Sequence, residues 1–170
     1  MKIIKIIREK DIFNDVQKKD DSRYTKKRDA VRIIVVGEDG KIALNHYSQN
    51  NEYQEEYGIP GGGVEIGEDI QKAMLREVKE ETGCVIESLE EIGIIIEYGV
   101  SPDLIQTVYC YTGKVKEKGE PVFTPKEIKN GLSIEWLSLD NAVQAISQNV
   151  QGFTKTRGLL FLEEYKKKLS

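Results

Sequence analysis

Three glutamates near the middle of the chain, Glu77, Glu80 and Glu81, have the chemistry and spacing expected of a metal site. On a helix that advances about 100° per residue, Glu81 lies about 40° to one side of Glu77 and Glu80 about 60° to the other. The same sector holds the apolar residues Ile70 and Met74, so the carboxylates do not form an ordinary solvated face. Like charges carried toward a core are unfavourable unless a cation compensates them. Anionic oxygen ligands suit magnesium, which also bridges to phosphate oxygens.

A glycine-rich loop, Gly58-Ile59-Pro60-Gly61-Gly62-Gly63, leads into this helix. Such a loop is not regular structure, and its backbone can approach a ligand or another element closely. A backbone carbonyl of Gly61 or Gly62 would therefore add a neutral oxygen ligand where the loop meets the helix. The helix is expected to open at Gly67-Glu68-Asp69, to run to about Thr82 and to end at Gly83.

The loop and helix together contain one fixed pattern, which runs from Gly62 to Cys84. Gly62 is followed after five residues by Glu68 and, after seven more, by Arg-Glu-Val-Lys-Glu-Glu-Thr-Gly-Cys. In this pattern the chain resembles the Nudix hydrolase family, and every fixed position of the family's motif is met. Cys84, in the closing apolar position, is the softest match. Outside this motif the resemblance to the family is looser. It continues in a strand pair before the motif and in a strand and helix around Trp136 after the motif.

The resemblance implies a role for each motif residue. Magnesium, for which manganese is a substitute, would be held by one backbone carbonyl and three carboxylates, and these are Gly61, Glu77, Glu80 and Glu81. Arg76 would orient Glu77 and neutralise part of the acidic charge. Glu68, at the start of the helix, is expected to be structural.

The reaction that this set supports is attack on phosphorus by a water that the metal makes more acidic, without a covalent nucleophile. The general base must be a carboxylate, and Glu77 is one candidate. The other is Glu127 in the 125–131 loop, where many family members place a further catalytic or metal-binding glutamate. Glu117 and Glu120 compete with Glu127 for this role.

Few other side chains invite a functional role. His46 is the only histidine, which excludes a cluster of imidazole ligands, and we expect it to be packed or exposed on a sheet. Three tyrosines would be able to stack on a nucleobase, but aromatic residues in strands usually belong to the core, so none is assigned: Tyr47, Tyr57 and Tyr98.

The elements that must position these residues alternate irregularly between strand and helix. Strands are expected at residues 1–8, 29–36, 41–47, 91–98, 104–115 and 133–137, and further helices at 140–150 and 156–168. This order favours an α+β domain of the Nudix fold, with a mixed β-sheet sandwiched between helices (α/β/α). Residues 29–170 are expected to form the Nudix domain and residues 1–28 an N-terminal strand or extension.

Composition limits the partners. With 170 residues and 39% hydrophobic residues the chain is long and apolar enough to bury a core, and its net charge of -4 does not favour nucleic acid. No run is apolar enough for a membrane span, and Cys84 and Cys110 lie in apolar runs as expected of buried thiols in the cytoplasm. We expect a small-molecule nucleotide as the partner, and the sequence leaves a homodimer open.

The expected activity is magnesium-dependent hydrolysis of a phosphoanhydride bond in a nucleoside diphosphate derivative. Nucleoside triphosphates, including oxidised ones, are the first candidates. A pyrophosphatase of ADP-ribose or another sugar nucleotide is the alternative, although Pro102 and Tyr98 fall near and not on the positions typical of such enzymes. A nucleotide-sensing Nudix module without activity is an alternative of another class. Such modules usually lose a motif carboxylate or the arginine, and this chain keeps them all.

Overall fold

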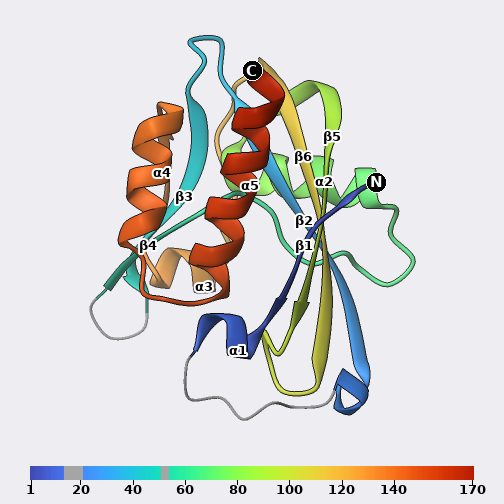
Figure 1. The fold of residues 1–170 in the computed structure, drawn as a ribbon. Coiled ribbons are helices and arrows are strands. Elements are labelled where there is room, and N and C mark those ends of the chain that lie inside the picture. The colour runs from blue at the N-terminus through green and yellow to red at the C-terminus, as the bar shows by residue number, and fades with distance from the viewer. Residues whose placement is uncertain (14–20, 51–53) are drawn as a thin grey trace.

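The computed structural model of the protein describes residues 1–13, 21–50 and 54–170, and it contains one mixed sheet with helices on both faces (Figure 1). The strands are β1 (Ile3–Arg8), β2 (Lys26–Val36), β3 (Ile42–Asn50), β4 (Gln54–Gly58), β5 (Val85–Tyr98), β6 (Leu104–Glu117) and β7 (Leu132–Leu137). The helices are α1 (Glu9–Ile12), α2 (Ile70–Thr82), α3 (Pro125–Lys129), α4 (Leu139–Gln148) and α5 (Phe153–Leu169), with a 3-10 turn at Asp21–Arg23.

The strand order is β1-β5-β6-β2-β3-β4, with β7 paired to β3 on a branch. β1 is parallel to β5 and β2 is parallel to β6, whereas the other pairs are antiparallel. β2 and β3 share a single register pair, Val36 with Ile42, so the sheet opens between them. The predicted mixed sheet between helices is confirmed.

Alternation along β2 divides the core between the two faces of the sheet. Ile34 packs in the cluster that includes Phe161 of α5, while Ile33 and Val35 pack in the cluster that includes Met74 of α2. Successive side chains of a strand point to opposite faces, so one strand supports both helical layers. Both faces of β2 are buried, and this strand therefore fixes where α2 lies relative to α5.

The N-terminal strand expected in residues 1–8 is present as β1, an edge strand beside β5. Residues 14–20 of the expected N-terminal extension lie outside the described part of the chain. Lys26, Lys27 and Arg28 already belong to β2, where they pair with the start of β6. The proposed domain division after residue 28 stays a prediction.

Several element limits differ from those expected. β5 begins at Val85, not near residue 91, because it pairs with β6 beyond register shifts at Glu87. Residues 125–131, expected as a loop, include the short helix α3. β4 was not expected at all, since its polar residues carry little strand signal. α4 begins at Leu139, one residue before its expected start, and its N-cap Ser138 accepts a hydrogen bond from the Asn141 amide.

Both cysteines are buried free thiols, as expected. Burial raises the pKa of the Cys110 thiol to about 12, which keeps it protonated and unreactive. In the described ranges, no helix is long and apolar enough to cross a membrane.

Candidate active site

Helix α2 places the acidic motif against the sheet. Asp69 caps its first turn by accepting hydrogen bonds from the amides of Gln71 and Lys72, and Gly83 ends it in the left-handed conformation at φ 71°. The helix thus begins at Ile70, directly after the expected opening Gly67-Glu68-Asp69, whose last residue is the N-cap. Its buried face carries two acidic residues beside apolar ones: Ala73, Met74, Glu77, Val78 and Glu81.

Arg76 ties the start of the motif to the helix. Its guanidinium donates to both carboxylate oxygens of Glu68 at 2.9 Å, and to the Gly63 carbonyl at 3.0 Å. It also donates to Glu77 Oε1 at 2.8 Å and reaches Glu80 Oε2 at 3.4 Å. These bonds lower the pKa of the Glu68 carboxyl to about 2. Arg76 therefore contacts both Glu68 and Glu77 directly, and the structural role expected of Glu68 stays a prediction.

Glu81 is the most deeply buried carboxylate of the motif, with 6% of its surface exposed. Its Oε2 accepts a hydrogen bond from the Gly61 amide at 2.7 Å. Burial raises its pKa to about 7, although the Asn45 side chain and the Gly61 amide lower it. Glu77 also has a pKa raised by burial, against the opposing effect of Arg76. Burial thus raises the pKa values of two neighbouring acids of the motif.

The glycine loop is pressed between β2 and α2. The Gly62 carbonyl accepts from the Val31 amide at 2.9 Å, and the Gly63 carbonyl accepts from Arg76. A Cβ on Gly62 would overlap the Glu77 carboxylate. Gly61 adopts φ 135°, and a Cβ there would overlap the Val31 carbonyl. The loop can approach the motif acids this closely only because it is made of glycine.

These residues fit a divalent cation by the chemistry of their donors. Glu77 and Glu81 are buried acids with raised pKa values, beside a loop backbone and the half-exposed Glu80. Across the described residues, no three acidic, histidine or cysteine side chains are already gathered into a metal cluster. Glu77 and Glu80 instead contact Arg76, and Glu81 contacts Gly61. A cation would therefore compete with these bonds and draw the carboxylates together.

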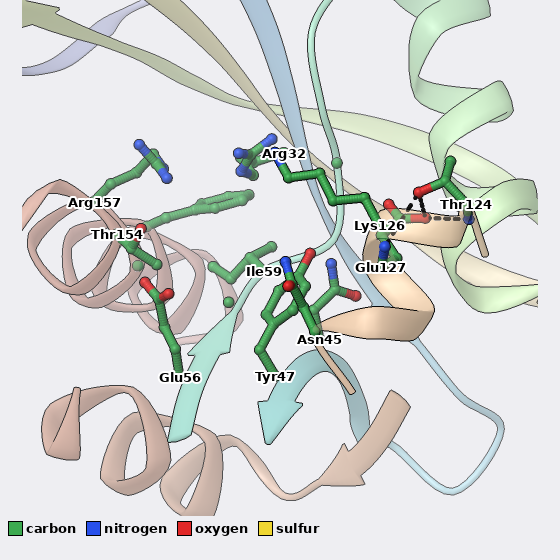
Figure 2. A pocket seen from close by; sticks show the side chains of 15 residues that line it. Arg32, Asn45, Tyr47, Glu56, Ile59, Thr124, Lys126, Glu127, Thr154 and Arg157 are labelled. Carbon is green, nitrogen blue, oxygen red and sulfur yellow. Dashed lines mark hydrogen bonds between the residues drawn. The ribbon is translucent and has the colours of Figure 1, made fainter. Parts of the chain in front are cut away.

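A cavity of about 380 Å³ opens beside this motif, lined by Gly61, Asn45 and residues from β2, β3, β4, α3 and α5. Figure 2 shows Arg157 and Thr154 on one side, Thr124 and Glu127 on the other, and Ile59 between them. The volume lies in the range typical of small-ligand sites. The cavity wall formed by Asn45 contacts the buried Glu81, so the cavity and the motif share one boundary.

Two arginines line this cavity, and one of them is paired with a buried acid. Glu97 of β5 is fully buried and accepts hydrogen bonds from Arg157 Nη1 at 2.7 Å and Gln106 Nε2 at 2.8 Å. Arg32 of β2 lines the same cavity and donates to the Val31 carbonyl. Burial, followed by the nearby Arg157, lowers the pKa of Arg32 to about 10, while Glu81 and other acids raise it.

Asn45 carries an unsatisfied polar atom at the boundary between cavity and motif. The residue is only 4% exposed, and among the described residues its Oδ1 is buried without a hydrogen-bond partner. Leaving such an acceptor unpaired costs about 1–3 kcal/mol. A donor from a bound ligand or water would satisfy it.

Glu127 lines the cavity from the opposite side. It occupies the third position of α3, and its Oε2 accepts from the Thr124 amide at 2.7 Å and the Thr124 hydroxyl at 2.8 Å. This capping box holds the carboxylate in place. The competing Glu117 lies at the end of β6. Glu120 lies at the close contact between residues 119–120 and Gly83, beyond the end of α2.

The remaining candidates lie as follows. His46 stacks on Tyr57 with ring centroids 4.4 Å apart, and its Nδ1 contacts Glu135 at 2.8 Å. Tyr98 contacts Tyr24 edge to face. Of the three tyrosines considered, Tyr47 alone lines the cavity.

Sequence reasoning did not single out Arg32, Arg157, Asn45 or Glu97. Arg32 and Glu97 did leave a signal, because each is a lone charge inside an apolar strand segment. Such a charge needs a partner when both faces of the strand are buried. For Glu97 the partner is Arg157, which lies far along the chain and gave no local signal in the sequence.

Comparisons with known proteins place the chain in a family. The family model described as NUDIX domain matches residues 26–155. An ADP-ribose pyrophosphatase of Methanocaldococcus jannaschii is 37% identical over 60 residues, which is 35% of this chain and 35% of that protein. A Bacillus subtilis protein provisionally named an 8-oxo-dGTP diphosphatase is 37% identical over 70 residues, which is 41% of this chain and 44% of that protein. The chain thus spans less than half the length of these two relatives.

A solved structure shows the same fold. The Nudix hydrolase from Nitrosomonas europaea has a TM-score of 0.65 to this chain at 21% identity, covering 84% of this chain and 90% of that one. The NUDIX match spans β2 through the start of α5 and includes the whole acidic motif on α2. The chain therefore belongs to the Nudix hydrolase family.

Proposed function

We propose that the chain hydrolyses a phosphoanhydride bond in a nucleoside diphosphate derivative in the presence of magnesium, and that nucleoside triphosphates, including oxidised ones, are its substrates. The observation that carries this proposal is the shared boundary between the buried acids of α2 and a cavity that contains Arg32 and Arg157. Acids suit the metal that accompanies a polyphosphate, and arginines suit the anionic or carbonyl groups of a nucleotide.

Gly61, Glu77, Glu80 and Glu81 would hold the cation. The carbonyls of Gly62 and Gly63 are bonded to Val31 and Arg76, which favours Gly61 as the backbone ligand. When bound, magnesium makes a water more acidic and neutralises charge on phosphate oxygens. Manganese would serve as a substitute.

The protein's own groups then orient the substrate and accept a proton. Arg76 donates a hydrogen bond to the Glu77 carboxylate and so would fix its position. Arg32, whose acidic neighbours Glu77 and Glu81 would turn to the cation, is the guanidinium best placed for a phosphate oxygen. The proton of the attacking water passes to a carboxylate, either Glu77 or Glu127. Both bonds from Thr124 go to Oε2 of Glu127, and its Oε1 is a second acceptor.

Two of the relatives are named for different classes of substrate. One similar protein is named for ADP-ribose and another for 8-oxo-dGTP, and neither is matched over half of its length. A sugar-nucleotide pyrophosphatase is therefore the second candidate. Both classes share the same metal-bound chemistry, and they differ in what fills the cavity.

The decisive experiment is release of phosphate and pyrophosphate from nucleoside triphosphates, oxidised guanine nucleotides, ADP-ribose and dinucleoside polyphosphates. Each reaction is run with magnesium and then with excess chelator. We expect chelator-sensitive pyrophosphate release from triphosphates. Turnover of ADP-ribose alone would transfer the assignment to the second candidate. Silence across the panel, with binding retained, would leave a nucleotide-sensing module.

A further inference from the structure

We infer that Arg32 and Arg157 form one anion site, which binds the terminal phosphoryl group of a nucleotide. The site favours ligands in which that phosphate is free over ligands in which it is esterified to a sugar. This inference rests on the proposed function and deepens it, because it separates the two candidate classes of substrate. It follows from how the two arginines are placed, how their charge is balanced and which donors they have left for a ligand.

The two guanidiniums belong to one cluster. Arg32 comes from β2 and Arg157 from α5, and both line the cavity of about 380 Å³. Burial lowers the pKa of Arg32, and the charge of the nearby Arg157 lowers it further. Figure 2 shows both arginines on the same side of Ile59, with Glu56 across the cavity and Glu127 toward α3. An anion bound in this cavity would offset the repulsion between the two cations.

The internal acid of this cluster balances only one of the two positive charges. Arg157 Nη1 donates to Glu97 at 2.7 Å, and the other oxygen of Glu97 accepts from Gln106 at 2.8 Å. Among the described residues no carboxylate forms an ion pair with Arg32, whose hydrogen bond goes to the neutral Val31 carbonyl. A buried charge without a partner is unfavourable, so the cluster is short of one negative charge.

The acids of α2 approach this cluster but are bonded to other groups. Glu81 and Glu77 raise the pKa of Arg32, and they act on it from beyond ion-pair distance. Glu81 accepts a hydrogen bond from the Gly61 amide, and Glu77 accepts one from Arg76. An anionic group of a ligand would therefore supply the charge that these acids do not bring into contact with Arg32.

Both arginines are held in place before any ligand binds. Arg32 lies in the middle of β2, which pairs with β6 along its whole length. Arg157 is only 7% exposed, and its helix packs closely on α4 at Gly158, where an added Cβ would lie 3.0 Å from the Ile146 side chain. A site whose donors are already ordered loses little conformational entropy on binding.

The donors that remain favour a terminal phosphate over a bridging one. Each guanidinium has several N–H donors and no acceptor. Both arginines use Nη1 for their bonds within the described chain, which leaves Nε and Nη2 of each for a ligand. A terminal phosphoryl group offers three free oxygens and about two negative charges, and esterification removes one oxygen and one charge. The lost charge-assisted hydrogen bond corresponds to roughly a tenfold or greater difference in affinity.

Binding in excess chelator tests this site without turnover and without a metal bridge to the phosphates. Dissociation constants are measured by calorimetry for ADP with ADP-ribose, and for UDP with UDP-glucose. Within each pair the nucleoside and both phosphoryl groups are the same, and only the outer phosphate changes from free to esterified. We expect the free diphosphate to bind roughly tenfold or more tightly in both pairs. Equal affinities, tighter binding of the sugar nucleotides, or no binding of any of the four would overturn the inference.

Two changes assign the preference to the cluster. Arg32→Gln removes the guanidinium without an ion pair, and the double variant Arg157→Gln/Glu97→Gln removes the other one without leaving a lone buried acid. We expect the preference to fall below about threefold in both. Arg23→Gln, with the same loss of charge at the exposed 3-10 turn, should keep it. An unchanged preference in either variant that folds would refute the anion site.

The outcome is distinct from a structural effect and from the outcome of the proposed function. Partial unfolding of a variant weakens both members of a pair alike, so it leaves the ratio of their affinities unchanged. Hydrolysis of triphosphates together with equal binding within each pair would remove the anion site and leave the hydrolase assignment intact. A preference for the free diphosphates without hydrolysis of any nucleotide would do the reverse.

Discussion

Glu81 and Glu97 are both buried carboxylates, and they differ in how their charge is balanced. Glu97 receives hydrogen bonds from Arg157 and Gln106, at 2.7 and 2.8 Å, and its cation is part of the protein. Glu81 is bonded to the neutral Gly61 amide and the Asn45 side chain, and its pKa rises to about 7. The charge of Glu97 is balanced within the fold, whereas a bound cation would balance that of Glu81.

This difference separates two uses of a buried acid. A carboxylate with an internal arginine orients that arginine, and removing either one leaves the other uncompensated. A carboxylate without such a partner holds a site open for metal at a cost to the stability of the metal-free protein. The same substitution should therefore have opposite effects at the two positions.

The largest effect is expected on turnover in Glu81→Gln. The variant loses an anionic ligand of the proposed metal site, and kcat should fall on the order of 1000-fold, which corresponds to about 4 kcal/mol. The free energy of unfolding in chelator should stay the same or rise, because a neutral amide is easier to bury. Glu163→Gln, an exposed acid on α5, is the control and should keep full activity. Full activity of Glu81→Gln would refute the metal assignment.

At Glu97 the same change should act on stability. Glu97→Gln leaves Arg157 buried without its carboxylate, and we expect the free energy of unfolding in urea to fall by about 3 kcal/mol. Adding Arg157→Gln should restore part of this loss, since the double variant has no lone buried charge. A Glu97→Gln variant as stable as the parent chain would show that the pair is not a closed unit, and would remove the contrast with Glu81.

The sequence predicts the part of this contrast that involves residues close together in the chain, and misses the part that involves residues far apart. The acids of α2 lie within one helix, so helical spacing predicted their common face and the Nudix motif named their roles. Glu97 and Arg157 come from β5 and α5, and only the pairing of β1, β5 and β6 beneath α5 brings them together. The lone charge of Glu97 in an apolar strand was a signal, but its partner was set by tertiary packing.

The pH dependence of stability gives a further test of the incomplete group. Burial raises the pKa of Glu81 from its ordinary value of 4.5 to about 7, so the folded state binds more protons between these values. Stability should then fall as pH rises through this window, by about 2 to 3 kcal/mol between pH 5 and 8 in chelator. Urea unfolding at several pH values measures it, and Glu81→Gln should flatten the dependence. A parent chain whose stability rises over this range would contradict the unbalanced burial of Glu81.

Glu127 is a third kind of carboxylate, because its hydrogen bonds come from the cap of its own helix. We expect its substitution to have the smallest effect on turnover and stability. Glu127→Gln keeps the capping box with Thr124, because glutamine serves at this position as glutamate does, so stability should change by less than about 0.5 kcal/mol. Turnover should fall roughly tenfold, the effect of losing an accessory proton acceptor beside the cavity. Measured kcat separates the roles. A loss near that of Glu81→Gln would make Glu127 the general base, and an unchanged kcat would leave it as a cap alone, with Glu77 as the acceptor of the proton.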